Sequence, residues 1–206
     1  LTGVFTPAPL AVIVKRPGCT WKGVFRNWGL VFCGNFAGAM TTAVLMAIVF
    51  TTGFSAEPNA VGQKIGSIGE ARTLGYAAAG SAGLLTVFVR AVLCNWMVST
   101  GVVAALMSTS TSGKIMAMWM PIIVFFYLGF EHSIVNMFLF PSGIMLGGQF
   151  TWVDYFVYNE IPVVIGNLVG GLTFVGGMIY ATHFRESPKR NASVERNDDT
   201  SVLPAE

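Results

Sequence analysis

The sequence has very little charge. Of its 206 residues, 11% are Asp, Glu, Lys or Arg and 53% are hydrophobic, and the mean hydropathy is +0.64. An average soluble protein has about 25% charged residues, so the composition disfavours an ordinary soluble domain. Several apolar stretches approach the roughly 20 residues that a membrane-spanning helix requires. We therefore predict an all-α integral membrane protein with several spans, whose surroundings are a lipid bilayer.

Ligands for metals and cofactors are also scarce. Cys19, Cys33 and Cys94 are widely spaced and do not form the pattern of a disulfide framework or a metal site. Of the two histidines, His183 falls at the end of an apolar stretch, which leaves only His132 inside one. Haem or metal ligation within a membrane normally needs several such ligands. We expect no metal, no cofactor and no enzyme activity, and the net charge of +2 without a basic face indicates no nucleic-acid partner.

Apolar stretches and short polar connections make up most of the chain. It opens at Leu1 within an apolar stretch that two prolines interrupt, without a signal-peptide pattern, and we expect its first spans to be missing. Lys and Arg are concentrated at 15–26, at Lys114 and in the tail, which the positive-inside rule places on the cytoplasmic side. We predict a transmembrane domain at 1–183 and a polar, disordered tail at 184–206. The domain has complete spans at 27–54, 84–107 and 161–182. A long connection at 55–83 and a loop with Asn159 and Glu160 join parts of it.

The most informative stretch runs from Lys114 to Phe140. Residues 115–130 are apolar apart from one tyrosine hydroxyl, and they are followed by Glu131 and His132 before apolar residues resume. At about 1.5 Å per residue, 115–130 reach about 24 Å, short of the roughly 30 Å hydrocarbon core of a bilayer. The two ionisable groups would then lie inside the membrane, where such groups usually mark a transport path. The alternative is a soluble core helix with one satisfied polar pair, which the composition disfavours.

A short internal repeat indicates how the spans are arranged. The pattern Gly-Asn-x-x-Gly occurs at 34–38 in the first complete span and again at 166–170 in the last. In an alternating topology these two spans run in opposite directions, as an inverted repeat with broken helices requires. The prolines near the N-terminus and the Glu-His pair would be the equivalent breaks of the two halves. The alternative is two unrelated faces of small residues that pack against other helices.

Three stretches resemble the formate/nitrite transporter family. Residues 129–138 (GFEHSIVNMF) are similar to the family's signature, 90–98 (RAVLCNWMV) to its second conserved stretch, and 26–28 (RNW) with 34–35 (GN) to a third. The resemblance implies a pentamer of six-span protomers, each with an aquaporin-like inverted repeat and its own pore. About four and a half spans are then present here. The missing part would be the first span and half of the second, with the loop that narrows the pore opposite the histidine.

The resemblance also implies a substrate class. Family members pass small monovalent anions such as formate, nitrite, bicarbonate, hydrosulfide or lactate, with or without a proton. Residues 90–98 and 108–113 are most similar to algal plastid-envelope members, which favours nitrite or bicarbonate and leaves open both the bacterial inner membrane and the plastid envelope as the location. The alternative function is a neutral-solute channel of the water or ammonia type.

Site residues follow from the same resemblance, residue by residue. His132 matches the family's central pore histidine, and Phe125, seven residues earlier, matches the aromatic residue of the cytoplasmic constriction. Glu131 matches the acid beside the histidine. Three asparagines match pore-path positions, namely Asn95, Asn136 and Asn167, although hydrogen bonding between helices is the alternative role for such residues.

The family's anion-attracting lysine has no direct match. An ungapped comparison puts Ala79 eleven residues before Arg90, where the lysine is expected, whereas a seven-residue insertion brings Arg72 to that place. Arg90 is the only cation inside a predicted span. We therefore predict an ion pair between Arg90 and Glu131, and the alternative is that Arg90 extends to the membrane surface.

His132 supplies the predicted chemistry. Its ordinary pKa of about 6.5 is close to neutrality, so the ring can donate a hydrogen bond or share a proton with a weak-acid anion. Bare charge in an apolar medium costs tens of kcal/mol by an idealised estimate. We hypothesise that His132 lets a monovalent anion cross as a hydrogen-bonded or transiently neutral species. The structural alternative is a histidine that locks the helix break through a hydrogen bond.

Overall fold

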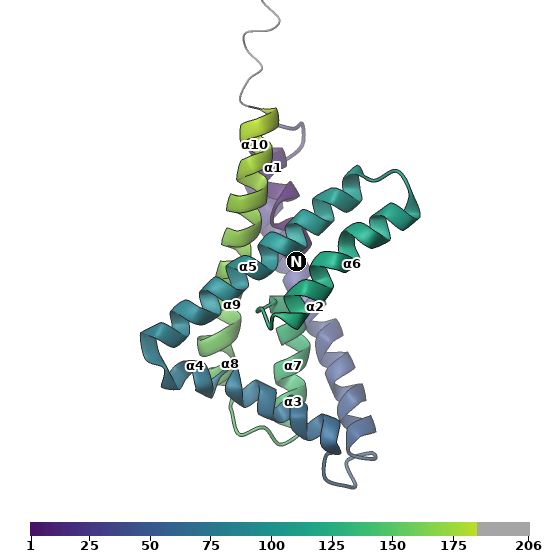
Figure 1. Ribbon diagram of the computed structural model, residues 1–206, viewed down its shortest axis with the longest axis vertical. Helices are drawn as coiled ribbons and strands as arrows, with labels where there is room; N and C mark the ends of the chain where they lie inside the picture. Colours follow the sequence, from purple (N-terminus) through teal and green to yellow (C-terminus); the bar gives the residue numbers. More distant parts are fainter. Residues whose placement is uncertain (185–206) are drawn as a thin grey trace, which may run out of the picture.

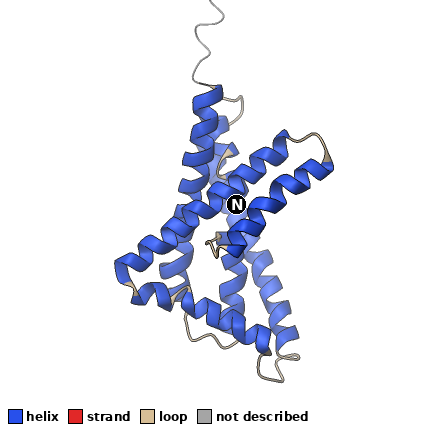
Figure 2. Ribbon diagram, viewed as in Figure 1, coloured by secondary structure: helices blue, strands red, loops and turns tan. Residues whose placement is uncertain are grey.

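The computed structural model describes residues 1–184, and every regular element in this part is helical (Figures 1 and 2). The predicted disordered tail lies outside the described residues from position 185 onward. Three elements are not α-helices: η1 is a short 3-10 helix, and η2 and η3 are π-helical turns. In chain order the elements are η1 (Thr2–Val4), α1 (Pro7–Ile13), α2 (Trp21–Phe50), α3 (Ala60–Ala71), α4 (Leu74–Ala78), α5 (Gly80–Met107), α6 (Thr111–Tyr127), α7 (Ser133–Met145), α8 (Trp152–Tyr155), η2 (Phe156–Glu160), α9 (Ile161–Val169), η3 (Gly170–Gly176) and α10 (Gly177–His183).

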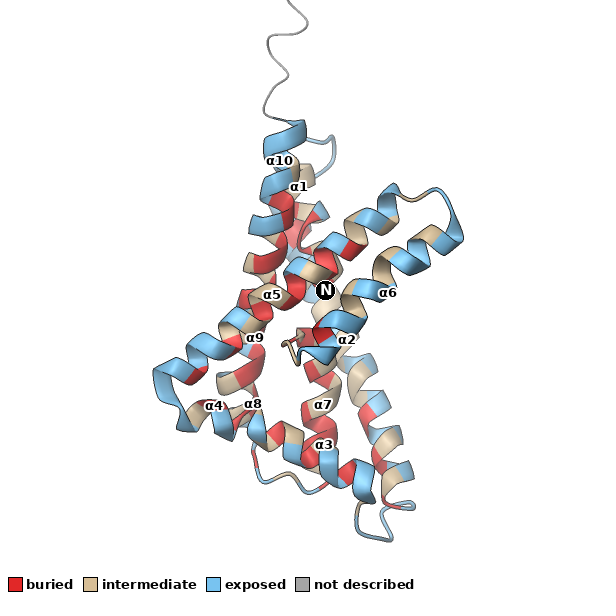
Figure 3. Ribbon diagram, viewed as in Figure 1, coloured by how far each residue is buried: buried red, intermediate tan, exposed pale blue. Residues whose placement is uncertain are grey.

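Three helices of the described part are long and apolar enough to cross a membrane by themselves. They are α2, α5 and the continuous helix from Trp152 to His183 that α8, η2, α9, η3 and α10 form together. Much of their length is exposed (pale blue in Figure 3), and the exposed residues include large apolar ones such as Phe25 and Val49 on α2 and Leu85 on α5. Soluble monomers rarely expose such large apolar surfaces, so the arrangement fits an integral membrane protein.

Three of the predicted boundaries are wrong. The first complete span, predicted at 27–54, is the helix α2 from Trp21 to Phe50. The last span begins at Trp152, so Asn159 and Glu160 lie inside a helix and not in a loop. The connection predicted at 55–83 forms α3 and α4. Glycines misled the prediction there because they form the packing face of α3. A Cβ added to Gly69, for example, would lie 2.4 Å from the Phe150 ring.

The helices α6 and α7 are the two halves of one interrupted span, as predicted. α6 ends at Tyr127, Gly129 takes a φ of 65°, and α7 begins at Ser133 with His132 as its N-cap residue. Glycine adopts a positive φ without the steric cost that a Cβ would add. Glu131 and His132 therefore lie in non-helical backbone between the two half-helices.

The short helix α1 is a second half-helix that starts in the interior. Its prolines occupy the first turn, where a missing N–H costs little. Thr6 and Ser133, at the starts of α1 and α7, hydrogen-bond to Gly171 and Asn167 of the same long helix. α1 runs upward and α7 downward in Figure 1. Two half-helices thus begin near the middle of one long helix and run in opposite directions, as an inverted repeat requires.

The Gly-Asn-x-x-Gly pattern at 166–170 marks a close approach between the last helix and α5. A Cβ added to Gly166 would lie 2.7 Å from the Ala91 Cβ, and one added to Gly170 would lie 2.2 Å from a backbone carbonyl oxygen of α5. In the described part of the chain, a Cβ added to the matching glycines of α2, Gly34 and Gly38, would meet nothing within 4 Å apart from the adjacent backbone of its own helix. The repeated pattern therefore makes an intramolecular helix contact in one of its two copies.

Candidate pore site

His132 uses both of its ring nitrogens. Nδ1 accepts a hydrogen bond from the backbone N–H of Val135 at 3.3 Å, which caps α7. An accepting nitrogen carries no proton, so the neutral ring has its proton on Nε2, which is 3.0 Å from Thr2 Oγ1 and donates to it. The ring thus locks the helix break, as the structural alternative predicted. It also presents one N–H donor between the two half-helices.

Phe125 lies directly against this ring. The two ring centroids are 5.4 Å apart with an interplanar angle of 14°, and Phe125 is 3% exposed. Its other side packs with Cys94 and Val98 of α5. Phe125 also lines a pocket of about 170 Å³ together with Arg72, Phe126, Phe130 and other side chains of α3 and α7. The constriction role of Phe125 stays a prediction, and its contact with His132 gives that prediction a physical basis.

Glu131 is fully buried, and its carboxylate bonds to side chains other than the His132 ring. One carboxylate oxygen accepts a hydrogen bond from the Tyr76 hydroxyl at 2.8 Å, and the other accepts from the side-chain amides of Asn136 and Asn159 at 3.0 and 3.2 Å. A buried carboxylate needs such partners, because an unpaired one is strongly destabilising. Through these hydrogen bonds Glu131 stabilises the non-helical segment between α6 and α7.

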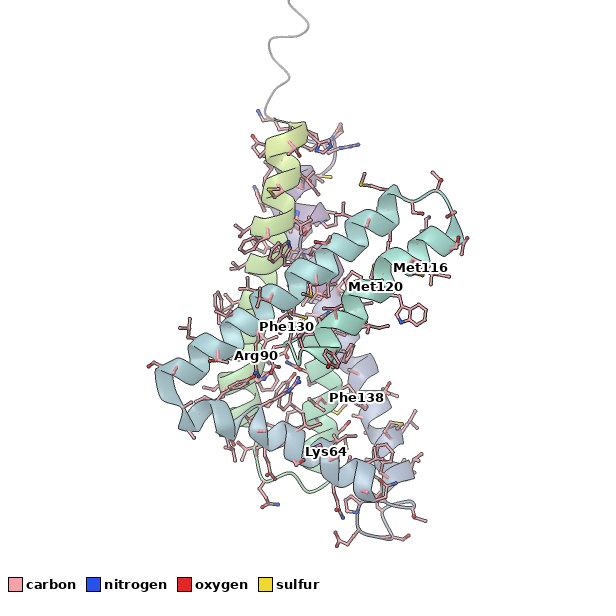
Figure 4. The ribbon with its side chains drawn as sticks, in the orientation of Figure 1. Lys64, Arg90, Met116, Met120, Phe130 and Phe138 are labelled. Carbon is pink, nitrogen blue, oxygen red and sulfur yellow. The ribbon has the colours of Figure 1, made fainter. Side chains whose placement is uncertain are left out.

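The predicted Arg90–Glu131 ion pair is not formed directly. In the described part of the chain the cation within 4 Å of Glu131 is Arg72, whose Nε is 3.6 Å from Oε1. Arg90 donates instead to the Tyr76 hydroxyl at 2.9 Å, so it reaches the carboxylate through that tyrosine. Arg90 and Phe130 both lie in the central region of the molecule (Figure 4). The prediction failed because it treated the segment with Arg72 and Tyr76 as a connection outside the core.

The three predicted asparagines are wholly buried; Asn136 donates to the side chains of Glu131 and Asn159, whereas the other two bond to the backbone. Asn95 donates to the carbonyl oxygen of Asn167 at 2.6 Å. Asn167 in turn donates to the carbonyl oxygens of Ala91 and Glu131 and accepts from the Ser133 N–H. One side chain therefore joins α5, the break and the start of α7. Hydrogen bonding between helices is what the geometry shows, and pore lining by these asparagines stays a prediction.

Two members of this network were missed by the sequence analysis. Asn159 connects Asn136, Glu131 and the Arg72 carbonyl oxygen. Tyr76 is the one aromatic residue in an Ala- and Gly-rich stretch. A large side chain alone among small ones was the feature of the sequence that could have indicated its role. Burial and then the charge of Glu131 raise the pKa of Tyr76 to about 12, so its hydroxyl keeps the proton that it donates.

The arrangement is suited to binding and passing a small polar solute. A single ring N–H is directed at the Thr2 hydroxyl of η1, next to the positive end of the α7 dipole. The nearby acid is occupied by hydrogen bonds, and residues 1–184 contain no cluster of three potential metal ligands. The fold and the site together define a helical membrane transport protein with paired half-helices.

The chain belongs to the formate/nitrite transporter family, whose sequence model matches residues 1–181. As expected from the sequence, the relatives are transporters and channels and not enzymes. The chain is 38% identical over 192 residues to a probable formate transporter of Methanothermobacter thermautotrophicus, covering 90% of this chain and 68% of the relative. It is 29% identical over 207 residues to the formate channel FocA of Escherichia coli (strain K12), covering 89% and 68%.

Solved structures agree with the sequence comparisons. A pentameric formate channel with formate bound gives a TM-score of 0.67 at 27% identity, covering 80% of this chain and 68% of that chain. An FNT family ion channel gives 0.72 at 27% identity, covering 88% and 68%. The chain thus spans about two thirds of the length of these relatives. The predicted all-α membrane fold is confirmed.

Proposed function

We propose that the protein is a channel for a small monovalent anion and that formate is its principal substrate. The observation that carries this proposal is the His132 ring, whose Nδ1 accepts the cap bond of α7 while its Nε2 proton is directed at Thr2 of η1, which precedes the half-helix α1. An anion that accepts this proton in a hydrogen bond is stabilised where bare charge is costly. A weak-acid anion can also share the proton and cross in a transiently neutral form.

The relatives support formate in particular. Three of them are described as a probable formate transporter, a formate channel and a formate channel with formate bound. Nitrite and bicarbonate, which the sequence analysis favoured, carry the same charge and are also conjugate bases of weak acids. The proposal places formate first and treats these two as secondary substrates of the same pore.

We propose that Arg72 supplies the anion attraction that the family's lysine was expected to give. Its side chain is 23% exposed and lines the pocket that Phe125 and Phe130 share. Its partner carboxylate, Glu131, is fully buried and does not line this pocket, so the positive group is the one that faces the entrance. A positive group beside a low-dielectric entrance raises the local concentration of anions.

We also propose a homo-pentamer with one pore in each protomer. The likeness to a pentameric formate channel, with a TM-score of 0.67, supports this assembly. Native mass spectrometry of the detergent-solubilised protein tests it directly. A monomer as the main species in mild detergent and in lipid nanodiscs would contradict the assembly.

The test of transport is a liposome flux assay. We expect formate to produce rapid swelling, with nitrite and bicarbonate slower and neutral solutes such as urea slower still. Equal rates for formate and urea would instead favour the neutral-solute channel. Empty liposomes and liposomes with heat-denatured protein give the baseline.

His132→Asn separates the proton-sharing role from the structural one. Asparagine is a good N-cap residue, so α7 keeps its cap while the imidazole is lost. We expect the variant to fold, to lose most formate flux and to lose its pH dependence. If it kept both the rate and the pH dependence of the wild type, proton sharing by His132 would have to be abandoned.

A further inference from the structure

A second buried acid lies beside the pore histidine. Glu160 is 1% exposed and lies within the membrane-spanning helix from Trp152 to His183. Its Oε1 accepts a hydrogen bond from the Ser133 hydroxyl at 2.5 Å, and its Oε2 accepts one from the Tyr155 hydroxyl at 2.9 Å. Ser133 and Tyr155 are themselves fully buried. The transport proposal makes no use of this acid, and the sequence analysis placed it in a loop.

The π-helical turn η2 explains how Glu160 reaches the break. Pro162 follows it and has no N–H to donate, which removes one hydrogen bond from the regular α-helical ladder. A π turn closes over five residues instead of four, so residues five apart come closer to one face. Tyr155 and Glu160 are five apart and bonded to each other, while Asn159 beside them bonds to Glu131. Such turns are frequent at functional sites.

The consequence is that both neighbours of His132 in the chain are held by one turn. Asn159 holds the Glu131 carboxylate, and Glu160 holds the Ser133 hydroxyl. The backbone around the histidine is fixed as well, because Asn167 binds the Glu131 carbonyl oxygen and the Ser133 N–H. The His132 side chain itself has lighter contacts, namely the cap, Thr2 and the Phe125 ring.

We propose that Glu160 is a positioning residue for His132 and acts through the hydroxyl of Ser133. The two oxygens of the carboxylate each take one hydroxyl, so Glu160 ties Ser133 to Tyr155 and sets where α7 starts relative to the last span. The position of the imidazole follows, because His132 is the residue directly before Ser133 and caps the same helix. The transport part of this inference rests on the proposed anion-channel function.

The test compares four variants of the full chain in lipid: Glu160→Ala, Glu160→Gln, Ser133→Ala and the double variant Glu160→Ala/Ser133→Ala. Glutamine can accept a hydrogen bond from one of the two hydroxyls through its carbonyl oxygen and donate one to the other hydroxyl oxygen through its amide group. We therefore expect Glu160→Gln to keep Ser133 and Tyr155 in place. The exposed acid Glu57, in the connection between α2 and α3, gives the control variant Glu57→Ala.

The first readout is the ¹⁵N spectrum of the His132 ring, recorded with labelled histidine in a His183→Asn background. The wild type is expected to show one protonated and one unprotonated nitrogen, as the hydrogen bonds assign. Glu160→Ala and Ser133→Ala should shift both signals in the same way, and the double variant no further. Glu160→Gln and Glu57→Ala should match the wild type. Unchanged signals in Ser133→Ala, which keeps the acid and needs only a small cavity, would overturn the proposal.

The second readout is formate flux as a function of pH. Glu160→Ala and Ser133→Ala are expected to lose about tenfold in flux, the effect of one lost hydrogen bond to a charged group, and to shift the pH midpoint equally. Independent, additive losses in the double variant would contradict action through Ser133. The spectra do not depend on transport, so they test the positioning role even in a protein that passes no formate. Failure of flux in the wild type would refute the proposed function alone.

Discussion

Tyr76 joins two charged groups, and its removal gives the sharpest test of the network. Its hydroxyl donates to Glu131 Oε1 at 2.8 Å and accepts from Arg90 at 2.9 Å. With a pKa raised to about 12, it remains protonated throughout the physiological range. We predict that Tyr76→Phe keeps the fold but lowers the free energy of unfolding.

The size of the loss follows from what the substitution removes. Phenylalanine keeps the ring, which packs in a buried cluster of α4, α5 and α9, so only the two hydrogen bonds disappear. A hydrogen bond to a charged group contributes about 1.5–3 kcal/mol in soluble proteins, whereas the average in a membrane protein is about 0.6 kcal/mol. Glu131 keeps three other partners. We therefore expect a loss of about 1–3 kcal/mol.

The assay is reversible unfolding with SDS in mixed micelles, followed by circular dichroism. Tyr127→Phe is the matched control, because Tyr127 is 88% exposed and should show no change. Arg90→Met should lose a similar amount, and the double variant Tyr76→Phe/Arg90→Met should lose less than the sum, since both act on one chain of bonds. If Tyr76→Phe were as stable as Tyr127→Phe, the hydroxyl would not tie the two charges together and the reasoning would be refuted.

Three further predictions concern the contact between the last helix and α5, the attraction of anions by Arg72 and the size limit set by Phe125. Gly170→Ala should destabilise the protein strongly, because its Cβ would lie 2.2 Å from a backbone carbonyl oxygen. Gly29→Ala is the control and should be neutral, because an added Cβ meets nothing within 4 Å. Thermal denaturation compares the two variants, and equal melting temperatures would contradict the close approach. Arg72→Met should slow formate flux and weaken the dependence of that flux on ionic strength, whereas Arg72→Lys should keep the flux and the salt dependence of the wild type. Equal flux in the two variants would exclude electrostatic attraction of the anion by residue 72. Phe125→Ala should admit larger monocarboxylates, because Phe125 stacks on the histidine, whereas Phe25→Ala should not, because Phe25 lies on α2 and is 61% exposed. An unchanged size limit in Phe125→Ala would exclude Phe125 from the constriction.

The break and its histidine could be predicted because charge is conspicuous in an apolar stretch. A Glu-His pair after 16 residues of apolar chain lies inside the membrane, where ionisable residues are rare and usually mark a transport path. The two prolines of α1 gave a second local signal of the same kind. These features depend on neighbours in sequence, which is why composition and spacing were enough.

The partners of the pair could not be predicted in the same way. Glu131 bonds to Tyr76, which is 55 residues away, and Glu160 bonds to Ser133, which is 27 residues away. A tyrosine among alanines and glycines, or an acid in a polar-looking segment, does not show in sequence which way it points. The ion-pair prediction went wrong for this reason, because it chose Arg90 by elimination while the fold brought Arg72 closer.

The network also explains how a histidine can respond to an anion without loosening the fold. Each of its neighbours in the chain is fixed by several buried hydrogen bonds, whereas the imidazole has one cap bond, one bond to Thr2 and one stacked ring. Moving a proton or an anion at Nε2 therefore disturbs only the bond to Thr2 and leaves the Glu131 and Ser133 bonds intact. Such division between a rigid frame and a single responsive group is what a preorganised site requires. The acid beside the histidine and the acid of the π turn accordingly belong to the frame, and the proposed function assigns the proton chemistry to His132 alone.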